Sequence, residues 1–340
     1  IRDRNKGRGK MKTIKILIPI YNEEESLLFL RNRLTSIIDK LTNYRIEVLF
    51  INDGSKDNSL KIIEGIRKKD NRFEYISFSR NFGKEIAIIA GLDYSRKSDA
   101  VIIMDADLQD PPELIPEMIQ EWEKGYDDVY ATRKTRDGET WLKKFTSTMY
   151  YKTLQKFTKI PIQKDTGDFR LLDKRCVQAI CKLRETGRCS KSIFSWIGYN
   201  KKAIYFDRDK RIAGVTKWNY KKLIDLAIDG ITSLSISPLR WPIYISFITF
   251  ASWLINLIYV IIKQTIEPYQ IIISLILFFM GIQFALIGIL GEYIGRIFNQ
   301  TKNRPLYLID EINGEKYWEN KDEEKDNNHF NNNYISSDIN

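Results

Sequence analysis

The sequence has few of the residues that carry most nucleophilic and metal chemistry. It contains one histidine, His329 in a polar C-terminal stretch, and three cysteines, Cys176, Cys181 and Cys189. These counts exclude a Ser-His-Asp triad, a Cys-His pair and a histidine-ligated metal from the body of the chain. Three cysteines at this spacing do not suit a zinc site, and with no signal-peptide pattern we expect a reducing compartment. Any metal must be bound by oxygen ligands, which favours Mg²⁺ or Mn²⁺.

Acidic residues are also fewer than basic residues. The 340 residues include 54 Lys and Arg against 44 Asp and Glu, a net charge of +10. This excess suits an anionic membrane or a phosphorylated substrate, whereas the scattered basic residues lack any pattern of a nucleic-acid-binding motif, so we expect no nucleic-acid partner. The first ten residues, "IRDRNKGRGK", precede Met11, and we expect them to be a remnant outside the native chain.

Apolar runs and helical patterns alternate in the first half of the chain. Strands are predicted over 14–20, 46–52, 73–79 and 100–106, and helices over 23–41, 57–68, 84–96 and 112–124. This alternation predicts a parallel sheet with helices on both faces, which binds ligands at the carboxyl ends of its strands. The clusters "YNEEE", "NDGSKD", "SRNFGK" and "DADLQD" directly follow the four strands. We therefore expect four polar clusters at one edge of the sheet.

The second half contains two long uncharged runs, 241–262 and 269–291. Each is long enough to cross a bilayer as a helix, so 239–298 is predicted to be a transmembrane hairpin. Arg240 precedes the pair, and Arg296, Lys302 and Arg304 follow it, which places both ends in the cytoplasm. Residues 217–238 are predicted to form an amphipathic helix on the membrane surface, with a core helix as the alternative. Residues 299–340 are predicted to form a cytoplasmic tail, and its polar end, 310–340, is predicted to be disordered.

Asp105 and Asp107 lie at the end of the fourth predicted strand. As residues i and i+2 of an extended strand, these two carboxylates face the same side. Two such charges repel unless a cation lies between them or one carboxyl stays protonated. A divalent metal that also binds a diphosphate would remove the repulsion. An ordinary polar strand end is the alternative.

Two other clusters also allow more than one interpretation. Asp53 lies in "NDGS", where it fits a turn and could also accept a hydrogen bond from a nucleotide base. Arg80 and Lys84 in "SRNFGK" could offset phosphate charge or form a solvated charge pair.

Seven motifs together resemble one known family. In chain order they are "PIYNEEE", "INDGSKDNS", "SRNFGKEIAIIAG", "DADLQDPPE", "ATRKTRDGETWLKKFTS", "TGDFRLLD" and "TKWNYKKL" with a following "DGI". This order resembles that of the polyisoprenyl-phosphate glycosyltransferases, inverting family 2 enzymes related to dolichol-phosphate mannose synthase. The subgroup with two C-terminal membrane helices includes the bactoprenol (undecaprenyl-phosphate) glucosyltransferases. The likeness extends from about Ile14 to Leu308.

The resemblance implies a fold, a reaction and a location. It implies an α/β GT-A fold, Rossmann-like with a mostly parallel sheet, over 11–216. The reaction would transfer a hexose, glucose from UDP-glucose, to undecaprenyl phosphate. UDP-N-acetylglucosamine and GDP-mannose are alternative donors, and a protein or polysaccharide is an alternative acceptor. The enzyme would be a multi-pass protein of the bacterial cytoplasmic membrane, with its catalytic domain and both termini in the cytoplasm. It would assemble as a homo-oligomer, a tetramer in the relatives.

The resemblance also implies roles for single residues. The nucleotide-sugar site would contain Pro19, Tyr21, Glu23, Asp53, Lys84, Asp105 and Gln109. The metal would be Mg²⁺ or Mn²⁺, held by Asp105, Asp107 and Gln109, and the lipid phosphate would meet Arg133, Lys143 and Ser147. Lys143 replaces an arginine of some relatives, so it keeps the charge and loses the bidentate fork. Asp168 and Asp107 would be the catalytic carboxylates, and a salt-bridge or capping role is the alternative for Asp168.

Two other classes of protein have distinct signatures. A processive polymer synthase of the same family would carry a "QxxRW" motif, which the sequence lacks. A membrane scaffold that binds nucleotides without catalysis would not need Asp105 and Asp107. Because the acceptor phosphate is already anionic, the predicted reaction needs positioning and charge neutralisation, and a body without histidine can supply both.

Overall fold

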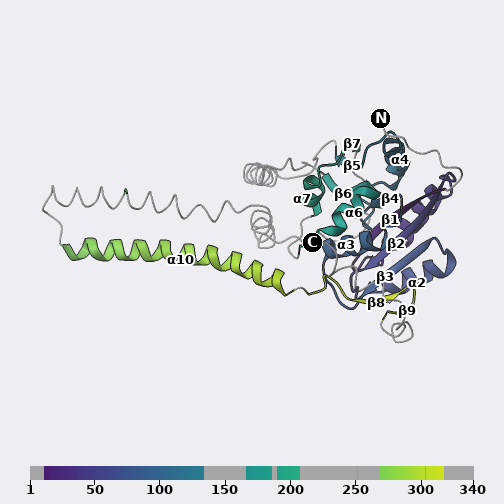
Figure 1. Cartoon of the computed structure of the whole chain (residues 1–340). Coiled ribbons are helices and arrows are strands. Elements are labelled where there is room, and N and C mark those ends of the chain that lie inside the picture. The colour runs from purple at the N-terminus through teal and green to yellow at the C-terminus, as the bar shows by residue number, and fades with distance from the viewer. Residues whose placement is uncertain are drawn as a thin grey trace, which may run out of the picture.

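The computed structural model describes residues 11–133, 166–185, 190–206, 251, 268–302 and 304–317. These residues form one nine-stranded sheet in the order β7-β5-β6-β4-β1-β2-β3-β8-β9 (Figure 1). The strands are β1 (Lys12–Ile20), β2 (Tyr44–Asn52), β3 (Phe73–Phe78), β4 (Ala100–Ile103), β5 (Asp128–Arg133), β6 (Thr166–Asp173), β7 (Lys201–Phe206), β8 (Ile309–Ile312) and β9 (Glu315–Lys316). The helices are α1 (Leu27–Ile38), α2 (Ser59–Lys69), α3 (Lys84–Tyr94), η1 (Pro112–Leu114), α4 (Ile115–Glu123), α6 (Lys174–Lys182), α7 (Ser190–Trp196) and α10 (Pro268–Thr301).

Helices cover both faces of the sheet, as the sequence predicts. Alternate side chains of β1, such as Ile14 and Ile16, pack with α1, α2 and α4 on one face. Leu17 points to the other face, where α3, α6 and α7 pack. A strand buried on both faces reads as a continuous apolar run, which is why the sequence shows little alternation within the central strands.

The strand order reverses at β1. This strand pairs in parallel with β2 on one side and β4 on the other, and β2 pairs in parallel with β3. Beyond β4 the sheet becomes mixed, because β6 pairs antiparallel with both β4 and β5. A reversal of this kind leaves a crevice at the carboxyl ends of the two strands involved, where α/β proteins bind ligands.

The predicted strand over 100–106 is wrong at its end. β4 stops at Ile103, and Asp105 and Asp107 lie in the following loop. Leu108 has a positive φ of 60° and is fully buried, so the chain turns here to insert this side chain into the core. The two carboxylates are therefore not adjacent same-side positions of a strand, and that part of the metal argument does not hold.

The C-terminal segment also differs from its prediction. Residues 310–317 are not disordered: β8 pairs antiparallel with β3, and β9 pairs antiparallel with β8. Ile309 is buried against the sheet, and this contact explains how a short strand forms in a polar stretch. The remainder of the predicted disordered end, 318–340, lies outside the described residues.

The second uncharged run is helical, as predicted. It lies within α10, a 34-residue helix that extends away from the α/β body (Figure 1). Judged on the described residues alone, no helix meets the length and hydropathy expected of a membrane span. The predicted surface helix, 217–238, and the first uncharged run, except Ala251, lie outside the described residues.

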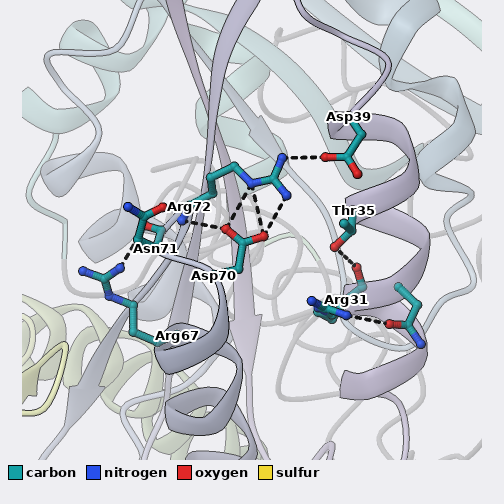
Figure 2. A network of polar contacts seen from close by, with 8 residues as sticks. Arg31, Thr35, Asp39, Arg67, Asp70, Asn71 and Arg72 are labelled. Atoms are coloured by element: carbon teal, nitrogen blue, oxygen red, sulfur yellow. Dashed lines mark hydrogen bonds and ion pairs between the residues drawn. The ribbon is translucent and has the colours of Figure 1, made fainter.

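Two arginine–aspartate contacts differ sharply in burial. On the surface, Arg72 makes a bidentate contact with Asp70 and reaches Asp39 at the end of α1, with Nη1–Oδ1 at 2.7 Å (Figure 2). Inside the sheet, the Arg170 guanidinium on β6 lies 3.2 Å from Asp128 on β5, and both side chains are fully buried. Lys201 on β7 is 3.9 Å from the same carboxylate. Burial raises the pKa of Asp128, and the two cations partly offset this effect.

This contrast predicts two different costs for the same substitution. Asp128→Ala removes the carboxylate that the buried Arg170 guanidinium contacts and is expected to lower the free energy of unfolding by about 3–5 kcal/mol. Asp39→Ala breaks the exposed contact with Arg72 and is expected to cost about 1 kcal/mol or less. Guanidinium denaturation of both variants in the same detergent measures the difference. Equal costs would show that the buried ion pair does not stabilise the fold.

Candidate active site

The polar clusters that follow β1, β2, β3 and β4 meet at one edge of the sheet. Asn22 and Glu23, after β1, donate backbone N–H groups to Ser55 and Ser59, which follow β2. The Asp53 amide donates to the Ile20 carbonyl oxygen at 2.8 Å, so the ends of β1 and β2 are joined directly. The sequence prediction of a shared edge is confirmed.

Asp53 holds the loop that follows β3. Its Oδ1 accepts from the Phe82 amide at 2.6 Å, and its Oδ2 accepts from the Gly83 amide and the Asn81 side chain, each at 2.9 Å. Burial raises the pKa of the Asp53 carboxyl, and the hydrogen bonds from the two amides oppose this rise. Asp53 therefore stabilises the loop after β3 in this structure, and its contact with a nucleotide base stays a prediction.

Gly54 explains why an Asp-Gly pair is needed here. Its φ is +64°, and a Cβ atom at this position would lie 2.5 Å from the backbone carbonyl carbon of Arg80. Only glycine allows both the left-handed conformation and this close approach of two loops. The pair thus fixes residues 80–83, which lead directly to Lys84 at the start of α3.

Lys84 connects two predicted site residues from different strands. Its Nζ lies 2.6 Å from Asp105 Oδ1, after β4, and 2.6 Å from Asp168 Oδ2, on β6. β4 and β6 pair antiparallel with Ile103 opposite Arg170, so the same register continued past β4 puts Asp168 opposite Asp105. Burial opposes the charge of Lys84, but the two carboxylates outweigh it and raise its pKa. Asp168 thus forms a salt bridge with Lys84, and its catalytic role stays a prediction.

Glu85 is a site neighbour that the sequence did not reveal. Its carboxylate accepts from the Ser190 amide at 2.8 Å and from the Ser190 hydroxyl, and so joins the start of α3 to α7. Burial, followed by the nearby Asp168 charge, raises the pKa of Glu85. Glu85 lies within the motif "SRNFGKEIAIIAG", but its role could not be read from the sequence, because its partner is more than a hundred residues away.

The residues proposed for the metal offer suitable ligands. Asp105, Asp107 and Gln109 supply hard oxygen atoms, which Mg²⁺ and Mn²⁺ prefer. The Gln109 side-chain oxygen is buried, and no described group donates a hydrogen bond to it. Within the part of the chain that the structure describes, no three His, Cys, Asp or Glu side chains cluster as a metal site. A divalent ion would thus depend on these two carboxylates, the amide and ligands from the substrate, and it would compete with Lys84 for Asp105.

The remaining predicted residues lie in different places. Pro19 is on β1, paired with Ile51 on β2, and Tyr21 and Glu23 follow in the adjacent loop, with Tyr21 exposed. They lie at the same sheet edge as Asp53. Arg133 is the last residue of β5, at the same position along the sheet as Phe206 of β7. The other two acceptor-phosphate candidates, Lys143 and Ser147, lie outside the described residues.

These features define the class of the protein. An α/β sheet with mostly parallel strands, and with carboxylates and a lysine gathered near the point where the strand order reverses, is an architecture that binds ligands at that edge. Comparison with family sequence patterns gives two matches: Glycosyl transferase family 2 over residues 15–181 and GtrB C-terminal hairpin over residues 237–297.

Individual relatives match almost the full length of the chain. An uncharacterized glycosyltransferase of Synechocystis sp. is 44% identical over 310 residues, which cover 89% of this chain and 96% of that protein. The bactoprenol glucosyl transferase of Shigella phage SfX is 40% identical over 302 residues, with 87% and 98% covered. The prophage bactoprenol glucosyl transferase homolog of Escherichia coli is 40% identical over 305 residues, with 88% and 99% covered. The chain belongs to glycosyl transferase family 2, and it is a glycosyltransferase.

Proposed function

We propose that the protein transfers glucose from UDP-glucose to undecaprenyl phosphate and so provides a lipid-linked sugar for the cell envelope. The observation that carries this proposal is the near full-length likeness to proteins named bactoprenol glucosyl transferase, at 40% identity over 302 residues. The cluster of Lys84, Asp105 and Asp168 at the sheet edge supports it. When a sugar leaves a nucleotide, negative charge develops on the diphosphate, and charged groups at the site have to stabilise it.

The proposed reaction needs no strong base. The acceptor is a phosphate monoester, which is mostly dianionic above pH 7. One of its oxygens attacks the anomeric carbon of the sugar from the face opposite UDP. The bond between that carbon and the diphosphate oxygen breaks, and its electron pair leaves with UDP. The sugar configuration is inverted, and no proton has to be removed from the nucleophile. Catalysis then depends on positioning and on neutralising the leaving group.

The chain supplies both of these needs. Lys84 holds Asp105 and Asp168 together, so the loop after β4 and strand β6 keep a fixed separation. Asp168 is then placed to orient the acceptor or the sugar, and Arg133, Lys143 and Ser147 would bind the lipid phosphate. When bound by Asp105, Asp107 and Gln109, Mg²⁺ or Mn²⁺ would offset the charge of the leaving diphosphate.

We also propose that residues 239–298 cross the bacterial cytoplasmic membrane twice, with the catalytic domain and both termini in the cytoplasm. The family hairpin match over 237–297 and the two uncharged runs support this proposal. α10 exposes large apolar side chains along its length, among them Ile272, Ile287 and Phe298. A polyprenyl tail stays in the bilayer, so its phosphate has to be met at the membrane surface. We expect a homo-oligomer, a tetramer by resemblance, in detergent.

The proposed function is tested with the full chain in detergent or vesicles. The enzyme is incubated with undecaprenyl phosphate and, in separate reactions, with radiolabelled UDP-glucose, UDP-N-acetylglucosamine and GDP-mannose. Label extracted into organic solvent from the UDP-glucose reaction only is the expected result. Lipid label from one of the other donors would show that the proposed donor, UDP-glucose, is wrong. Label that enters protein or polymer and never the lipid extract would contradict the proposed acceptor.

A further inference from the structure

The chain returns to the catalytic domain after α10. Residues 304–317, which we name the C-terminal strap, run along the edge of the sheet beside β3 (Figure 1). Only a few residues separate the end of α10 from the first contacts of the strap. The Gln300 side chain near the end of α10 already donates to the Arg184 carbonyl oxygen at 3.4 Å. The helix is thus joined to the catalytic domain at a defined place.

Residues 308–313 of the strap are hydrogen-bonded to β3 and to the residue that follows it. β8 pairs with β3 with Ile312 opposite Ile76. At one end, the Tyr75 amide donates to the Asn313 side-chain oxygen at 2.8 Å. At the other end, the Ser79 amide donates to the Leu308 carbonyl oxygen at 3.1 Å. Ser79 is the first residue after β3, so this bond lies at the start of the loop that carries Arg80 and leads to Lys84.

Tyr307 contacts both elements that flank this loop. Its ring stacks on Phe78, the last residue of β3, with a centroid distance of 5.4 Å. Its hydroxyl donates to Asp93, near the end of α3, at 3.0 Å. Asp93 is held in place by a bidentate contact with Arg184, at 2.7 Å for each nitrogen. One side chain of the strap therefore fixes the strand before the loop to the helix after it.

The contacts continue into the active site. Phe78 meets Phe82 edge to face at 5.7 Å, and the Arg80 guanidinium lies 4.0 Å from the centre of the Phe82 ring. The Phe82 amide is the group that Asp53 binds most closely in this loop, at 2.6 Å. Two residues later, Lys84 contacts Asp105 and Asp168. A continuous set of packed rings and hydrogen bonds thus leads from Tyr307 to the residues proposed to bind the donor.

We propose that the C-terminal strap positions the donor site, with Tyr307 as the positioning residue, and so couples the C-terminal helix α10 to the placement of Lys84. Loss of the Tyr307 ring frees β3 and α3 to move apart, and residues 79–84 then spend less time in the arrangement that the donor needs. Acceptor binding is assigned to Arg133, Lys143 and Ser147, and Arg133 ends β5, which lies on the opposite side of β1 from β3. Only the kinetic test of this role for the strap depends on the proposed function.

The test compares three variants of the full chain. Tyr307→Ala removes the ring and the hydroxyl, Tyr307→Phe removes the hydroxyl alone, and Lys316→Ala changes an exposed strap residue that contacts Asp310 and Glu311. For Tyr307→Ala we expect the KM for the nucleotide sugar to rise about tenfold while the KM for the lipid changes less than about twofold. Tyr307→Phe should give an intermediate rise, and Lys316→Ala should match wild type.

Amide hydrogen exchange without any ligand gives a second readout that does not depend on the reaction. In Tyr307→Ala, peptides that cover 79–84 should exchange faster, while peptides from β1 and β2 stay as in wild type. Unchanged exchange in 79–84 together with an unchanged donor KM would overturn the proposal. Faster exchange throughout the domain would show that Tyr307 only stabilises the fold, and would also overturn it. If wild type transfers no sugar to lipid, the proposed function fails, and the exchange data still decide the role of the strap.

Discussion

Asp105→Asn and Asp107→Asn are each expected to lower turnover by at least about 10²–10³-fold, because each removes a carboxylate proposed to hold the divalent ion that would neutralise the leaving diphosphate. Both side chains lie in the loop after β4, and their replacement keeps the size of the residue. Asp105→Asn also weakens one of the two carboxylate contacts of Lys84. We therefore expect Asp105→Asn to impair both metal binding and the placement of Lys84, and Asp107→Asn to impair metal binding alone.

Asp99→Asn is the matched control for these two variants. Asp99 precedes the same strand at its opposite end, where its carboxylate accepts from the Thr13 amide at 2.9 Å. An asparagine oxygen can accept this bond, so the control should stay close to wild type. A loss in Asp99→Asn as large as in the site variants would mean that the substitutions act through the fold.

Metal dependence is measured separately from turnover. EDTA should abolish transfer, and Mg²⁺ or Mn²⁺ should restore it. Binding of Mn²⁺ in the presence of UDP, followed by electron paramagnetic resonance without acceptor, should be weaker in Asp105→Asn and Asp107→Asn than in wild type. Full transfer in the presence of chelator would remove the metal from the mechanism and leave Lys84 as the cation of the site.

The sequence predicted the central part of the fold well, because its signals there are local. The order of apolar strands and amphipathic helices from β1 to α4 follows from short-range patterns, and the polar clusters predicted that the ends of these strands meet at one edge of the sheet. The end of β4 could not be read in this way. The strand stops where its ladders to β1 and β6 stop, at Ile103, and the register of β6 depends on residues far along the chain.

The composition of the site was easier to predict than its contacts. Lys84, Asp105 and Asp168 were each singled out by a motif, but the motifs lie on three separate segments. The antiparallel pairing of β4 with β6, which ends with Ile103 opposite Arg170, brings the loop after β4 beside Asp168, and Lys84 contacts both Asp105 and Asp168. The C-terminal strap could not be predicted for a similar reason. Its polar composition does not favour a strand, but β8 forms because β3, at the edge of the sheet, offers backbone hydrogen-bond partners.

Asp168→Asn is expected to lower single-turnover transfer by about 10²-fold or more, with a loss that changes little between pH 6.5 and 9. The physical reason is the contact of Asp168 with Lys84, at 2.6 Å. A carboxylate that is held by an ammonium group is suited to fixing a neighbouring group in place, and less suited to accepting a proton. Asparagine keeps the shape but loses the ionic contact, so Lys84 and the bound substrate are expected to be misplaced.

The pH profile separates this role from general base catalysis. If Asp168 removed a proton, a higher pH would ionise the acceptor without its help and restore the variant towards the wild-type rate. The acceptor phosphate has a second pKa near 6, so above pH 7 it is already mostly dianionic, and little remains for a base to do. Recovery of Asp168→Asn to near the wild-type rate at pH 9 would therefore establish Asp168 as a base and contradict the positioning role.

Asp173→Asn, at the other end of β6, is the matched control for this experiment. Asp173 caps α6 by accepting from the Arg175 amide at 3.0 Å, and it also accepts from the Trp122 indole. Asparagine caps helices almost as well as aspartate, so transfer should stay near the wild-type rate at every pH. An Asp168→Asn enzyme that behaves like this control would show that the contact with Lys84 is structural.

Donor affinity in the absence of acceptor is a second measurement. We expect this affinity to fall in Lys84→Met and in Asp168→Asn alike, because the two side chains form one contact.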